Sequence, residues 1–175
     1  MTPAEISDEL RRASDDFHHL VDNATTAELR MRSNGTKWTN DQLLFHMLFG
    51  YMLVRSLLWL LTVFSSLPSG ASRRFAHALN AATGPFHVIN YVGSLGGARL
   101  LGHSGMERVM DRVTRSLIHT AETASDKQLQ RGMHFPVGWD PYFRDFMTVQ
   151  DVLHYATQHY DHHRRQLTLS DARID

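Results

Sequence analysis

The feature that most constrains the fold is an apolar stretch over residues 43–67, whose only Lys, Arg, Asp or Glu is Arg55. A helix of this length is long enough to span a bilayer. A central arginine would cost about 3 kcal/mol in that setting, which disfavours insertion. We therefore expect a helix that is buried on most sides inside a bundle, and we expect no membrane partner.

Four capping boxes indicate where helices begin. In each box a Ser or Thr precedes an acidic or amide side chain by three residues, so that each side chain can bond the other's backbone N–H. Apolar residues then recur three and four positions apart, as they do on the buried face of a helix. The pattern predicts helices over about residues 2–23, 39–64, 104–125 and 148–169, and it predicts no sheet.

The connections between these helices are unequal in length. About fourteen residues join the first two helices, whereas residues 68–103 and 125–147 form much longer crossings. Long crossings allow the second and third helices to run parallel, so we expect an all-α four-helix bundle with long crossover connections. The apolar segment 85–102 is expected to pack over one end of the bundle or against a second subunit. The chain of 175 residues suits one core, so residues 1–175 are predicted to form a single domain.

Composition excludes several classes of function. The 18 acidic and 18 basic side chains balance, so no overall field attracts nucleic acid or an anionic membrane. Cysteine is absent, which excludes disulfides, thiolate metal ligands and a protein-borne thiol nucleophile. The charged N-terminal segment lacks the apolar region of a signal peptide, so we expect a cytoplasmic location.

The segment HYATQHYDHHRRQL, residues 154–167, contains four histidines. A rotation of about 100° per helical residue places His159 and His163 on one face with the apolar positions of this helix. His162 then lies at the edge of that face, and His154 lies on the solvent side. Two imidazoles four residues apart can bind one ion, although they can equally be polar core residues bonded to carbonyls or water.

A third histidine is directed into the bundle from the second predicted helix. His46 shares its face with Leu43, Gly50 and Val54. Burying an imidazole among aliphatic side chains is unfavourable unless it gains a partner. That partner must be another side chain, a water molecule or a metal.

The segments KWTNDQLLFHMLFGYM and HYATQHYDHHRRQL together resemble the DinB-like (DinB/YfiT-like) metalloenzymes. In that family a turn containing a Trp precedes a helix with one ligand histidine, and the last helix carries His-x3-His followed by a Gln. The matching residues here are Trp38, His46, His159, His163 and Gln166. The resemblance implies a bundle of up-down-down-up order, a divalent-metal site made by His46, His159 and His163, and frequent homodimers. A His159/His162 pair remains an alternative.

Three neutral nitrogen ligands leave coordination positions open, as in catalytic metal sites. Zinc suits such a site, and nickel, iron and manganese are alternatives. The resemblance, which extends to mycothiol-dependent maleylpyruvate isomerase-type proteins, implies a thiol S-transferase or isomerase. Its partners would be a small-molecule substrate and a low-molecular-weight thiol. Two alternatives stay open: a non-catalytic metal-binding or stress-related protein, and a metal-dependent hydrolase, which requires a carboxylate beside the bound water.

The remaining candidates are weaker. Asp161 points away from the histidine face, so it does not supply the carboxylate of a hydrolase. Asp140 and Asp41 are expected to act as turn or cap residues, although either can approach the metal from a helix end. We expect His134 to pack at a bundle end with neighbouring aromatics rather than to cover the metal. Arg55 is expected to pair with an acid or to reach solvent.

Overall fold

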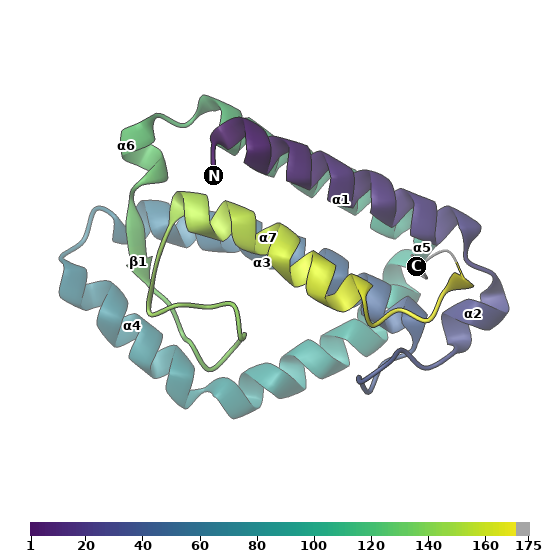
Figure 1. Ribbon diagram of the computed structural model, residues 1–175. Coiled ribbons are helices and arrows are strands. Elements are labelled where there is room, and N and C mark those ends of the chain that lie inside the picture. The colour runs from purple at the N-terminus through teal and green to yellow at the C-terminus, as the bar shows by residue number, and fades with distance from the viewer. Residues whose placement is uncertain (171–175) are drawn as a thin grey trace.

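The computed structural model describes residues 1–170, which form a helical bundle with a small two-stranded sheet (Figure 1). The long bundle helices are α1 (Pro3–Asn23), α3 (Asn40–Phe64), α5 (Thr83–Thr123) and α7 (Val149–Arg164). Shorter helices lie in the connections: α2 (Thr26–Arg30), α4 (Ser69–Ala81) and α6 (Asp126–Leu129). The strands are β1 (Gly132–His134) and β2 (Phe146–Thr148).

The bundle has the up-down-down-up order. In Figure 1, α1 and α7 run in one direction, whereas α3 and the second half of α5 run in the other. Helices α1 and α3 each pack against both α5 and α7. The four-helix fold expected from the sequence is therefore confirmed, and it places α3 directly beside α7.

Local capping explains where three of the four bundle helices begin. The hydroxyls of Thr2, Thr39 and Thr148 each accept a hydrogen bond from the backbone N–H three residues on. The side chain of that later residue in turn accepts a hydrogen bond from the backbone N–H of the threonine. The predicted starts are correct at these three positions. Helix α7 ends at Arg164, five residues before the expected end at residue 169.

The first long crossing is helical, which corrects the expectation for residues 68–103. Helix α4 and the first half of α5 form an arm along one side of the bundle (Figure 1), and α5 begins at Thr83 rather than near Ser104. The α5 axis kinks at Gly102, where φ is 61°, a conformation that favours glycine. The predicted third helix is the part of α5 that follows this kink.

Close backbone packing holds the first half of α5 against α3. A Cβ built on Gly97 would lie 2.0 Å from the Phe45 ring, so only glycine permits this approach. Ser94 and Ala98 are buried on the same side of the helix. The opposite side exposes apolar residues, among them Ile89, which is 66% exposed. This face would suit a second subunit, and the homodimer stays a prediction.

The expectation of no sheet is wrong. Strands β1 and β2 pair antiparallel, with Met133 opposite Met147, and both methionines are buried. Burial of these two side chains favours pairing of strands only three residues long. The pairing brings together the two ends of the loop 135–145, which connects the strands. This loop supplies one wall of the site described below.

Helix α3 is a core helix of the bundle. It has the length and composition of a membrane span, yet twelve of its 25 residues are buried against neighbouring elements. Arg55 lies on its exposed side, in agreement with the expectation that it reaches solvent. The inward side carries His46.

Candidate metal centre

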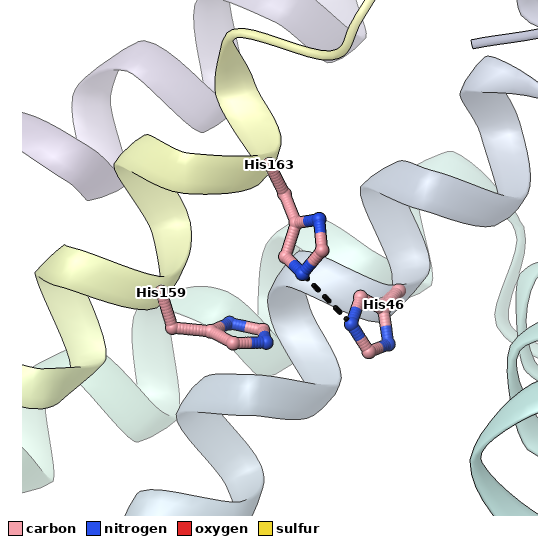
Figure 2. Close-up of side chains that lie close together, drawn as sticks. All are labelled: His46, His159 and His163. Atoms are coloured by element: carbon pink, nitrogen blue, oxygen red, sulfur yellow. Dashed lines mark hydrogen bonds between the residues drawn. The ribbon is translucent and has the colours of Figure 1, made fainter. Parts of the chain in front are cut away.

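Three histidines from two helices converge in the bundle interior. His46 comes from α3, and His159 and His163 come from successive turns of α7 (Figure 2). Each offers one ring nitrogen, and the three nitrogens lie within 4.8 Å of one another. His46 and His159 are each only 5% exposed. The structure thus brings together the three residues that the sequence singled out.

The polar contacts of two of the rings suit protonation at Nδ1. The His163 Nδ1 atom lies 2.7 Å from Gln166 Oε1, an acceptor, so Nδ1 carries the proton. The His46 Nδ1 atom lies 3.5 Å from the Ser94 hydroxyl oxygen, and this hydroxyl donates its own proton to the Asn90 carbonyl at 2.9 Å. The Ser94 hydroxyl oxygen is therefore placed to accept from a protonated Nδ1 of His46.

Protonation of both rings at Nδ1 would leave two lone pairs facing each other. The Nε2 atoms of His46 and His163 are 3.1 Å apart, and neither has a proton to share when both Nδ1 atoms are protonated. Two such nitrogens repel unless a cation lies between them. Two nitrogens bound at 2.0–2.1 Å to one tetrahedral ion would be separated by about 3.3 Å. The pair therefore fits the spacing and the electronic state of metal ligands.

His159 is placed by a glycine on the facing helix. A Cβ built on Gly50 would lie 2.4 Å from His159 Nδ1 and 2.7 Å from its Cε1. The ring thus occupies space that any other side chain at position 50 would fill. Gly50 is a site residue that the sequence reasoning missed. The available signal was a glycine inside a long apolar helix, where it costs about 1 kcal/mol relative to alanine.

Burial keeps all three imidazoles neutral. Burial and, to a smaller extent, the neighbouring His163 lower the pKa of His46 to about 3. Burial also lowers the pKa of His163 to about 4. The pKa of His159 lies well below its ordinary value because of burial and the two adjacent histidines. Neutral imidazole is the form that binds metal, so the cluster is ready to bind an ion at neutral pH.

A carboxylate lies beside the cluster, which corrects the expectation for Asp140. Its Oδ2 atom is 3.9 Å from His159 Nε2 and accepts a hydrogen bond of 2.9 Å from the Tyr155 hydroxyl. Its Oδ1 atom accepts the backbone N–H of Tyr142 at 2.9 Å, which is the expected turn role. Burial raises the pKa of this carboxyl group. Asp140 is therefore both a turn residue and a member of the site.

The cluster opens onto a cavity of about 190 Å³ between α3, α5, α7 and the loop 135–145. Trp38 lines it with its ring stacked on His46 at a centroid distance of 4.4 Å. Phe86 and Trp139 form a second stacked pair at 3.8 Å. The cavity gives the histidines a partly apolar chamber in which a small molecule can approach them.

Two other histidines, His162 and His134, were sequence candidates for the site. His162 lines the cavity, and its Nδ1 atom and the Tyr142 hydroxyl share a 3.2 Å hydrogen bond, but His162 is not part of the three-histidine cluster. His134 lies in β1, 3.2 Å from an Asp145 carboxylate oxygen and outside the cavity lining. His134 does not cover the cluster, as expected, whereas the neighbouring aromatics Trp139 and Tyr142 line the cavity, which corrects the expectation for those two residues.

The remaining sequence candidates contact other elements. His154 contacts Glu9 of α1 at 2.9 Å and is half-buried, so it faces α1 rather than open solvent. Asp161 pairs with Arg12 of α1 at 2.8 Å and points away from the cluster, as expected. Asp41 lies outside the cavity lining. None of these three residues is positioned to act at the cluster.

Comparisons with known proteins agree with this fold. The family model of the DinB superfamily matches residues 9–167. YfiT from Bacillus subtilis has a similar structure, with a TM-score of 0.66 and 14% identity over 95% of this chain and 83% of that chain. It is described as a probable metal-dependent hydrolase with an unusual four-helix bundle topology. The comparison with curated proteins gives no match.

Proposed function

The chain belongs to the DinB superfamily, and on that premise we propose that it is a metal-dependent enzyme. His46, His159 and His163 hold the divalent ion, and Asp140 accepts a proton from the nucleophile. The observation that carries this proposal is the convergence of three buried imidazoles, with the Nε2 atoms of His46 and His163 3.1 Å apart and a buried carboxylate at the edge of the same cluster.

The donor set suits several divalent ions. Zinc binds three imidazoles in catalytic sites, and nickel, iron and manganese accept the same ligands. When bound, the ion supplies a Lewis acid that lowers the pKa of a bound water or thiol. The protein's own contribution is to hold the imidazoles neutral and to fix two of them through Gln166 and Ser94.

Hydrolysis is the reaction that the geometry supports best. A hydrolase needs a carboxylate near the nucleophilic water, and Asp140 Oδ2 is the atom placed for that role. Burial raises the pKa of Asp140, which makes it a stronger proton acceptor than an exposed aspartate. The hydroxyl of Tyr155 holds Oδ2 in place. The description of YfiT as a probable metal-dependent hydrolase supports the same reaction class.

Thiol transfer or isomerisation is the second candidate. Asp140 would then accept the proton of an S–H group instead of a water proton. The cavity beside the histidines supports this candidate because it offers apolar walls to an external thiol or its acceptor. The thiol must be external because the chain contains no cysteine.

The first experiment measures metal content in protein purified without added metal or a histidine tag. Cobalt-substituted protein then separates the two reactions. A sulfur-to-metal charge-transfer band on addition of cellular thiols would support thiol transfer. Turnover of ester or amide substrates without such a band would support hydrolysis. Absence of bound metal would overturn the proposal.

Replacing Asp140 tests the proton acceptor. We expect Asp140→Asn to keep its metal and to lose activity by about 10²-fold or more, as for other general bases. Asp145→Asn is the matched control, since this loop aspartate has a side chain that is 80% exposed. Full activity in the Asp140 variant would refute the assigned role.

A further inference from the structure

We propose that the substrate places a flat, uncharged apolar group, such as a single aromatic ring, in the cavity beside the three histidines. The inference deepens the proposed function and rests on it. It concerns the part of the substrate that lies away from the reacting group, and it follows from the charges, the walls and the size of the cavity.

The cavity lining contains no permanent positive charge. The chain has sixteen arginines and two lysines, yet none of them is among the lining residues of the described chain. The one carboxylate in the lining is Asp140. A substrate carboxylate or phosphate placed away from the metal would meet no arginine or lysine and would lose its hydration. The lining therefore disfavours an anionic group in that position.

The walls present preformed aromatic surface. The rings of Phe86 and Trp139 stack at 3.8 Å with an interplanar angle of 8°. The indole N–H of Trp139 donates to the Leu79 carbonyl at 2.9 Å, and the Gly138 N–H donates to Asn80 at 3.0 Å. These bonds use the polar atom of the indole and fix the loop on α4. A rigid apolar wall binds a flat ring without ordering new side chains.

The size of the cavity limits the group that fits. Its volume is about 190 Å³, below the roughly 300–1,000 Å³ of sites for drug-sized ligands. Trp38 lies at the metal end, stacked on His46. One ring joined to a small reactive group fits this space.

Three hydroxamates test the proposal on cobalt-loaded protein, because they share one metal-binding group. The probes are acetohydroxamate, benzohydroxamate and 4-carboxybenzohydroxamate, and the readout is the Kd from the cobalt absorption spectrum. We expect benzohydroxamate to bind at least tenfold more tightly than acetohydroxamate. We expect the added carboxylate to remove most of this preference.

Two variants test whether the aromatic wall of the cavity causes the preference for benzohydroxamate. Phe86→Ala should abolish the preference for benzohydroxamate while leaving the Kd of acetohydroxamate unchanged, which also shows that the site is intact. Trp59→Ala is the control, since Trp59 is 67% exposed and outside the cavity lining. Equal Kd values for acetohydroxamate and benzohydroxamate, or tighter binding of the carboxylated probe, would overturn the substrate class. If no hydroxamate binds, the proposed metal site itself fails.

Discussion

Replacing Gly50 with alanine is the sharpest test of how His159 is held. The new Cβ would lie 2.4 Å from His159 Nδ1, whereas ordinary contacts between such atoms are about 3.5 Å. The ring or the helix must therefore move by roughly 1 Å. Metal–ligand distances tolerate only about 0.2 Å, so the nitrogen of His159 would leave its position. The substitution should weaken metal binding without replacing a ligand.

The expected magnitudes separate a metal effect from a folding effect. Disturbing the support of a ligand typically lowers metal affinity about 10–100-fold, which is about 1.4–2.7 kcal/mol. That amount is lost from the metal-bound stability, because bound metal stabilises the native state by mass action. In metal-free protein, overpacking costs about 1–3 kcal/mol, and removal of a helical glycine returns about 1 kcal/mol. In Gly50→Ala, the extra stability that bound metal confers should therefore decrease. The stability of the metal-free protein changes only by the balance of two opposing effects.

The assay compares the metal Kd from chelator competition with unfolding curves recorded with and without chelator. Gly93→Ala is the matched control, since a Cβ at this α5 position meets no heavy atom within 4 Å. It should keep full metal affinity. Wild-type affinity in Gly50→Ala would show that His159 is not held as a ligand against Gly50, and the reasoning would be refuted.

Three further predictions address the cluster and the surface. Alanine at any of the three ligand histidines should reduce metal content and chelator sensitivity, whereas His154→Ala should keep its metal; equal metal loss from the His154 variant would contradict the assignment. In metal-free protein the pKa values of His46 and His163 are about 3 and about 4 in the folded state. The unfolded chain, with values near 6.5, binds more protons below that pH, so stability should fall between about pH 6.5 and pH 4 by about 1.4 kcal/mol per pH unit for each residue. Urea unfolding at pH 7, 6 and 5 measures this slope, and a flat profile would contradict it. If α5 carries the homodimer interface, Ile89→Glu should halve the mass measured by light scattering, and a wild-type monomer would remove that expectation.

Local signals in the sequence determined the bundle and the direction of the histidines. Capping at Thr2, Thr39 and Thr148 depends on residues three positions apart, so it can be read without the fold. The helical rotation likewise placed His159 and His163 on one inward face. That His46 lies opposite this pair came from the family resemblance, and the structure shows the convergence.

Tertiary structure alone decided the features that depend on distant partners. The arm formed by α4 and the first half of α5 depends on packing such as that of Gly97 against Phe45, which no local pattern records. The strands β1 and β2 are too short for a periodic signal, and they form because Met133 and Met147 are buried together. Those strands enclose the loop that brings Asp140 to His159. Side-chain chemistry was thus readable from the sequence, whereas the carboxylate and the glycine that complete the site depend on contacts between segments far apart in the chain.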